Sequence, residues 1–255
     1  MDSPAVRQPH ASLVSEGRWP KAEKIRRLLS LDDWSRERPP RVLEIGTGSG
    51  AIAHYLAVRS GLGCDVDAVD VVDQRQIRDG YRFTQVDSVV LPFDDAQFDI
   101  VISNHVLEHV GAQDQQRHHL REIARVLTPE GRAYLASPNR WQVVEPHFNV
   151  AFLSWLPQAL RTPYLKMRGK GEFYDCEPLR MGELERLLAG EDLHFRNACV
   201  PALRVMLDLE NQPSLPLRWV GKLPDRILEW MKPVCPTHVY LLRKKSPAER
   251  NGHAR

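Results

Sequence analysis

Short apolar runs alternate with amphipathic stretches along the first half of the chain. Apolar runs closed by glycine or polar residues predict buried strands, here at 41–45, 66–71, 82–86, 98–103 and 132–137. Apolar residues spaced three and four apart predict helices over 49–60, 74–79 and 114–127, and another helix in "WPKAEKIRRLLSL" from Trp19. Strands that alternate with helices form a parallel sheet covered by helices on both faces.

The pattern changes after Pro138, where proline and aromatic residues become frequent. A helix within 179–195 then leads into a strand near 193–200, and "THVYLLRKK" closes the chain's pattern as a last strand. We therefore expect an α/β fold with a doubly wound, mostly parallel seven-stranded sheet. One domain is expected over 19–245, with two inserts at 139–178 and 201–236 as a lid over the substrate, and with flexible ends at 1–18 and 246–255.

Composition excludes several classes of protein. Of the 255 residues 42% are hydrophobic and 27% are charged, as in ordinary globular proteins. The net charge of +2 is too small to indicate a nucleic-acid partner. No apolar run approaches the roughly 18 residues that span a bilayer, and the N-terminus has no apolar region of a secretion signal. The four cysteines lack C-x-x-C spacing, so we expect reduced packing residues, no metal site and a cytoplasmic protein.

The stretch "VLEIGTGSGAIA", residues 42–53, breaks from a strand into three glycines and then into a helix. Gly46, Gly48 and Ala51 fit the dinucleotide pattern G-x-G-x-x-G/A. Glu44 followed by Gly46, Gly48 and Gly50 equally fits the acidic G-x-G-x-G loop of S-adenosylmethionine (SAM) enzymes. The loop alone leaves both cofactors open.

Acidic residues follow the next two predicted strands. Asp70 ends the second strand, where a carboxylate can accept both ribose hydroxyls, and Asp73 is the fallback for this contact. Asp87 lies just past the third strand, where it can accept a hydrogen bond from the adenine amine while the Ser88 N–H donates to the ring. Because both cofactors contain adenosine, these contacts do not distinguish NAD from SAM.

The later motifs decide between the two. "FDIVISNHVLEHV" and "REIARVLTPEGRAYLASPN" follow the glycine loop and its acids in an order that resembles the class I SAM-dependent methyltransferases of the small-molecule type 11 group, over roughly residues 40–140. Methyltransferases of exocyclic base amines usually carry N-P-P-aromatic or D-P-P-aromatic where this chain has "SNHV", so the resemblance excludes that subclass.

The resemblance implies a role for each matching residue. It implies SAM as cofactor and S-adenosyl-L-homocysteine as product, with these binding residues: Glu44, Gly46, Thr47, Gly48 and Gly50 at the methionine end, Asp70 and Val71 at the ribose, Asp87 and Ser88 at the adenine, and Asn104 near the sulfonium.

Methyl transfer to a hydroxyl is an in-line displacement that needs positioning and a base of near-neutral pKa. His147 belongs to "SPNRWQVVEPHFNVAFLSWLP", a segment that follows the carboxyl end of the fifth strand and should lie over the methyl group. A subgroup of the methyltransferases that this chain resembles has a similar P-N-R…E-P-H…L-x-W-L-P run in the same place. We expect His147 to be the base or an acceptor contact, with His105 as the rival base and Glu145 orienting either. The competing interpretation is a buried histidine that only packs the insert.

Acceptor contacts are expected from the N-terminal helix and the first insert, at Trp19, Glu145, Phe148 and Arg161. Arg161 belongs to a basic cluster with Lys166, Arg168 and Lys170 that would hold a phosphate or carboxylate if it faced the cleft.

The predicted function is therefore methyl transfer to a hydroxyl of a small molecule, first a sugar or a lipid- or nucleotide-linked glycan. A quinone or polyketide phenol is the alternative acceptor, and an NAD(P)-dependent oxidoreductase or a non-catalytic SAM-binding subunit are alternatives of another class. No nucleic acid is expected. "LPLRWVGKLPDRILEWMKP" resembles an interfacial helix that Gly221 and Pro224 interrupt, so membrane-surface contact stays open, as does the oligomeric state.

Overall fold

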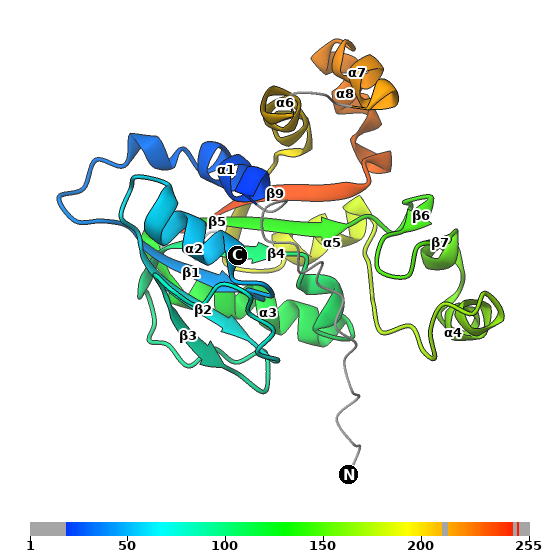
Figure 1. Cartoon of the computed structure of the whole chain (residues 1–255), viewed down its shortest axis with the longest axis horizontal. Coiled ribbons are helices and arrows are strands. Elements are labelled where there is room, and N and C mark those ends of the chain that lie inside the picture. Colours follow the sequence, from blue (N-terminus) through cyan, green and yellow to red (C-terminus); the bar gives the residue numbers. More distant parts are fainter. Residues whose placement is uncertain (1–18, 211–213, 247–248, 250–255) are drawn as a thin grey trace.

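The computed structural model describes residues 19–210, 214–246 and 249, and most of both ends expected to be flexible lies outside this range. A seven-stranded sheet in the order β3-β2-β1-β4-β5-β9-β8 forms the centre of the molecule (Figure 1). Its strands are β1 (Arg41–Ile45), β2 (Asp65–Asp70), β3 (Arg82–Gln85), β4 (Phe98–Asn104), β5 (Leu127–Pro138), β8 (Leu193–Asn197) and β9 (Thr237–Lys244). The first five run parallel and β9 runs antiparallel to both its neighbours, which confirms the predicted fold class.

The strand register brings the predicted cofactor residues to one edge of the sheet. Ile45 pairs with Val69 on one side and with Ser103 on the other. The glycine loop, the acid at the end of β2 and the end of β4 therefore leave the sheet side by side at its carboxyl edge, where such sheets bind ligands.

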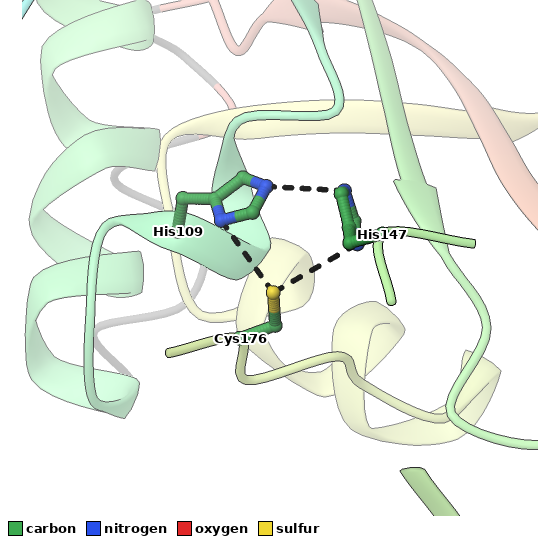
Figure 2. Close-up of side chains that lie close together, drawn as sticks. All are labelled: His109, His147 and Cys176. Atoms are coloured by element: carbon green, nitrogen blue, oxygen red, sulfur yellow. Dashed lines mark hydrogen bonds between the residues drawn. The ribbon is translucent and has the colours of Figure 1, made fainter. Parts of the chain in front are cut away.

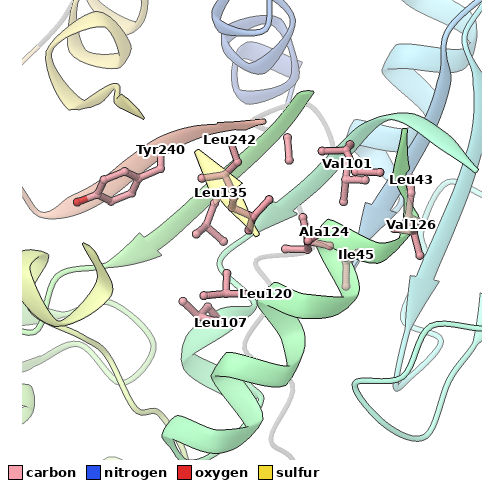
Figure 3. Close-up of a cluster of buried hydrophobic side chains, with 14 of the residues drawn as sticks. Leu43, Ile45, Val101, Leu107, Leu120, Ala124, Val126, Leu135, Tyr240 and Leu242 are labelled. Atoms are coloured by element: carbon pink, nitrogen blue, oxygen red, sulfur yellow. The ribbon is translucent and has the colours of Figure 1, made fainter. Parts of the chain in front are cut away.

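Helices cover both faces of the sheet, and each face has its own apolar core. α1 (Trp19–Leu28), α2 (Ala51–His54) and α6 (Cys199–Leu209) pack on one face. The 3₁₀ turn η4 (Leu107–His109), α3 (Gln113–Val126) and α5 (Met181–Ala189) pack on the other, where Leu120 and Ala124 of α3 meet strand residues such as Leu135 (Figure 3). Two buried faces explain why the strands read as continuous apolar runs.

The two inserts extend away from the sheet (Figure 1). The first holds β6 (Val144–Glu145), β7 (Val150–Ala151), η5 (Leu153–Trp155) and α4 (Gln158–Met167) around a small core of its own. The second holds α7 (Leu215–Gly221), α8 (Asp225–Met231) and η6 (Lys232–Val234); η2 (Leu31–Asp33) and the π-helical turn η3 (Tyr55–Arg59) complete the elements. Within the described residues, no helix has the length and apolar character needed to cross a membrane.

One predicted helix is wrong. Residues 74–79 form a loop, because their backbone is used elsewhere: the N–H groups of Gln76 and Ile77 both donate to the carbonyl of Ser49 in the glycine loop. The Asp73 carboxylate accepts from Arg75, which further fixes the loop. The strand predicted near 193–200 ends at Asn197, since α6 begins at Cys199. Helices α4 and α6 were not predicted, whereas α7 and α8 lie in the stretch interpreted as an interfacial helix that Gly221 and Pro224 interrupt.

Candidate active site

A cavity of about 370 Å³ lies at the carboxyl edge of the parallel strands. Its wall combines the loop after β1, the end of β2, the segment after β3, the end of β4 and the first insert. Among the predicted site residues, those that line it are Gly46, Gly48, Asp70, Val71, Ser88, Asn104, His105 and His147.

The glycine loop owes its shape to left-handed backbone conformations. Gly46 has φ +74°, and a Cβ there would lie 2.4 Å from Cγ2 of Val106, so only glycine fits. Gly48 has φ +53° and faces the cavity. Gly50 is also left-handed, but a side chain on it would meet the carbonyl of Ile77 and the hydroxyl of Tyr81 rather than a cofactor. Its role is to let the 71–81 loop pack closely.

Glu44 and Thr47 lie beneath the loop. Glu44 is buried, and its carboxylate accepts from the Thr47 hydroxyl at 2.7 Å and from the Ala53 N–H at 3.0 Å. These bonds tie the strand end to the first turn of α2. Glu44 therefore supports the loop's conformation, whereas the sequence alone had suggested that it would contact the cofactor.

Asp70 is built into the same loop. Its Oδ2 accepts from the Gly48 N–H at 2.8 Å and its Oδ1 from the Val71 N–H at 2.8 Å. Asp73, the fallback ribose ligand, is engaged by Arg75 and Arg78. The Arg75 guanidinium lowers the pKa of Asp73 well below its ordinary value. This geometry supports Asp70 rather than Asp73 as the ribose contact.

The segments expected at the adenine and at the sulfonium also contribute to the cavity wall. Ser88 and Asn104 line the cavity, together with Val86, Val89 and Leu91. Asp87 is exposed beside them. Asp87 does not line the cavity, so its contact with the adenine stays a prediction.

His105 and His147 reach the cavity from different segments. His105 follows β4 with φ +59°, a strained conformation for a side chain of this size, and about a third of its side chain is exposed. Its Nδ1 lies 3.4 Å from Oε1 of Glu108, which is fully buried. Burial acts to raise the pKa of Glu108, but His105 and His109 lower it below its ordinary value, so the carboxylate stays charged.

His147 is held by Glu145, as the sequence suggested. The two approach to 2.6 Å between Nδ1 and Oε1, and Glu145 is buried. Burial acts to lower the pKa of His147, but the bond to Glu145 raises it above its ordinary value. The Nε2 atom of the same ring lies 3.3 Å from Nε2 of His109.

The residues predicted to contact the acceptor do not line the cavity; they are Trp19, Glu145, Phe148 and Arg161. Trp19 stacks under the guanidinium of Arg59, 3.9 Å from its ring centre. Phe148 is buried in the insert's own core beside Tyr174. Glu145 acts through His147 and the Phe148 N–H.

Arg161 is buried as well. It donates to the Leu156 carbonyl and pairs with Glu177, so it holds the insert together. The other three members of its basic cluster are exposed. The basic cluster therefore does not form one charged surface. Arg161 is its only buried member, and Glu177 already pairs with it.

Sequence reasoning did not assign several residues that line the cavity, among them Lys21, His109, Val110, His119 and Asp175. His109 lies one helical turn after His105, and that spacing was the only signal available for it. His119 reaches the cavity from α3 and contacts the Ser103 hydroxyl at 2.9 Å. Burial lowers the pKa of His119 to about 4, so it is neutral at physiological pH.

Comparison with known proteins agrees with the motifs. Residues 43–135 match the family model of the methyltransferase domain. A protein of Mycobacterium tuberculosis named "Probable S-adenosylmethionine-dependent methyltransferase" is 36% identical over 101 residues, which are 39% of this chain and 36% of that protein. "Probable tRNA methyltransferase 9B" of Bos taurus is 32% identical over 130 residues, 49% of this chain and 25% of that protein. The chain thus spans well under half the length of these curated relatives.

A solved structure shares the fold over nearly the whole chain. It is the complex of the Haloferax volcanii Trm112 methyltransferase activator with a methyltransferase, at a TM-score of 0.53 and 19% identity, covering 95% of this chain and 100% of the matched chain. The dinucleotide interpretation of the glycine loop is set aside. Residues 43–135 match the methyltransferase domain, and the motif order and the seven-stranded sheet agree with a class I SAM-dependent methyltransferase, with SAM as its cofactor.

Proposed function

We propose that this chain transfers the methyl group of SAM to a hydroxyl of a small-molecule acceptor. A sugar or a lipid- or nucleotide-linked glycan is the first class to test, and a quinone or polyketide phenol the second. One observation carries the proposal: two histidines from separate segments line the cavity that holds the cofactor loop. The four cysteines are all free, which suits a reducing compartment, and we place the reaction in the cytosol.

The cofactor half of the site would bind SAM through the glycine-loop backbone and through the carboxylates that follow β2 and β3. Gly46 and Gly48 leave room for the methionine end, Asp70 would accept the ribose hydroxyls, and Ser88 with Asp87 would contact the adenine. The sulfonium then lies near Asn104. Since the leaving group is a neutral thioether, the enzyme's main contribution is to align the acceptor oxygen with the methyl carbon.

We assign the acceptor's proton to His105. Its side chain is more exposed than that of His147, and the buried carboxylate of Glu108 lies 3.4 Å from its Nδ1. The acceptor oxygen attacks the methyl carbon, the C–S bond breaks, and the hydroxyl proton moves to His105 while S-adenosyl-L-homocysteine leaves. His147, whose Nδ1 is held by Glu145, would help to hold the acceptor instead of taking its proton.

The test is methyl transfer from labelled SAM to panels of hydroxylated glycans and phenols, with total tRNA as a separate arm because one relative is named as a tRNA methyltransferase. With an accepted substrate, His105→Gln should lower turnover by about 10²- to 10⁴-fold at nearly unchanged SAM affinity. His147→Gln should raise the KM of the acceptor. The control is His194→Gln on β8, whose side chain is half exposed.

Two results would contradict this proposal. If only total tRNA is methylated, the acceptor is RNA and not a small molecule. Full turnover in His105→Gln would return the proton-accepting role to His147.

A further inference from the structure

Three side chains known as ligands of transition metals meet in the cavity wall. His109 comes from η4, His147 from the turn after β6, and Cys176 from the segment that leads to α5 (Figure 2). Nε2 of His109 and Nε2 of His147 are 3.3 Å apart, and the sulfur of Cys176 lies 3.6 Å from Nδ1 of His109 and 3.8 Å from Nδ1 of His147. In the described part of the chain, no other set of three such donors comes this close together.

The three side chains lie nearly close enough to share one tetrahedral ion. With ordinary Zn–N and Zn–S bonds, two ligand atoms on one zinc lie about 3.3 to 3.7 Å apart. A single ion contacts one nitrogen of each ring, whereas the sulfur here is nearest to Nδ1 of both. Binding through Nε2 therefore requires a rotation of the imidazoles or of the Cys176 side chain. One donor atom from each of the three residues already lies within 4.8 Å of the other two.

The surroundings of His147 match those of a metal ligand. Glu145 is buried and sits 2.6 Å from Nδ1, so a proton shared there leaves Nε2 as the metal-binding atom. A carboxylate on the far nitrogen is the usual partner of a metal-bound histidine. The second oxygen of Glu145 accepts from the Phe148 N–H at 2.8 Å, which fixes the carboxylate's own orientation.

The three donors leave one side open. His109 and His147 line the cavity, whereas Cys176 is buried behind them. An ion held by all three would therefore direct its fourth position into the cavity, where the acceptor binds. Three protein ligands with one open position are the arrangement of catalytic zinc sites.

We propose that His109, His147 and Cys176 bind a zinc ion whose open position takes the acceptor oxygen. This rests on the proposed function and deepens it. A zinc ion held there would act as a Lewis acid that makes the acceptor hydroxyl more acidic. His105 would take the hydroxyl proton while the acceptor oxygen forms its bond to the methyl carbon and the C–S bond of SAM breaks. S-adenosyl-L-homocysteine would leave as a neutral thioether.

The first experiment measures zinc itself, without SAM or acceptor. The full chain is purified, stripped with a chelator and titrated with Zn²⁺ against a chromophoric chelator. We expect about one zinc per chain and a rise of the melting temperature on loading. Loss of affinity should exceed roughly 100-fold in Cys176→Ser and reach about 10- to 100-fold in Glu145→Gln. Cys64→Ser, a buried cysteine in the α1 core, is the matched control and should bind zinc as the wild type does.

Cobalt provides a second measurement that packing alone would not affect. Co²⁺ bound by Cys176 should give a thiolate-to-metal charge-transfer band, absent in Cys176→Ser and retained in Cys64→Ser. Absence of zinc and cobalt binding by the folded wild type overturns the site, and so does binding that Cys176→Ser leaves unchanged. Phenol is the probe for the open position, and a cobalt spectrum that phenol leaves unaltered overturns that position. None of these outcomes depends on turnover, so failure of the methylation screen is distinguishable from failure of the metal site.

Discussion

The cofactor side and the proposed acceptor side of this cavity are built by different means. On the cofactor side, the contacts come from backbone at the ends of neighbouring strands: Gly48 donates to Asp70, and Gly46 donates to the carbonyl of Val69. On the proposed acceptor side, side chains from distant segments meet, as His147 of the first insert meets His109 of η4. Substitutions in the first region should therefore act on SAM binding, and those in the second on the acceptor.

The largest expected effect is in the glycine loop. Gly48→Val places a β-branched side chain at φ +53° against the cavity, and we expect SAM affinity to fall by more than about 3 kcal/mol, measured by calorimetry. Gly63→Val is the matched control, because Gly63 has φ +57° but a Cβ on it would meet no other atom within 4 Å. Equal SAM affinity in the two variants would mean that the loop does not approach the cofactor.

Acid should destabilise the sheet side through two buried histidines. Burial lowers the pKa of His119 and of His238 to about 4, while an unfolded histidine titrates near 6.5. Between these values the unfolded chain binds more protons than the folded one, so this contribution is complete above pH 6.5 and is lost as the pH falls toward 4. The loss should reach at most about 3 kcal/mol for each histidine.

The measurement for this prediction is urea unfolding at a series of pH values. Neither ring nitrogen of His238 has a hydrogen-bond partner in the described part of the chain. His238→Leu should therefore make the free energy of unfolding depend less on pH. His194→Gln, on the surface, should keep the wild-type slope. A wild-type slope in His238→Leu would show that this histidine is not neutral in the folded protein.

Asp70 tests the cofactor side more finely. Asp70→Asn keeps one oxygen for the Gly48 N–H but loses the charge and one acceptor for the ribose, so SAM affinity should fall by about 1–3 kcal/mol. Asp73→Asn should leave it unchanged, since Arg75 and Arg78 engage that carboxylate. The reverse result, measured by the same titration, would move the ribose contact to Asp73.

The sequence predicted the sheet side well because its signals are local. Apolar runs placed β1, β2 and β4, and a glycine that must adopt positive φ marks its own position. The prediction of a helix at 74–79 was wrong, because two N–H groups that a helix would have used donate to the carbonyl of Ser49. Nor could spacing along the chain bring His109 and Cys176 together, because their proximity depends on how the insert folds back on η4.

The smallest expected effect concerns the basic cluster, and it tests the acceptor side directly. Lys166 is more than half exposed and pairs with Glu172, which is more exposed still, so the pair adds little to stability. Lys166→Ala should change the free energy of unfolding by no more than about 0.5 kcal/mol, and SAM affinity should not change. The acceptor's KM should also stay the same, whether or not the acceptor carries a phosphate. A rise in KM confined to phosphorylated acceptors would show that the exposed cations do reach the substrate, and the acceptor side would then extend beyond the residues that line the cavity in this structure.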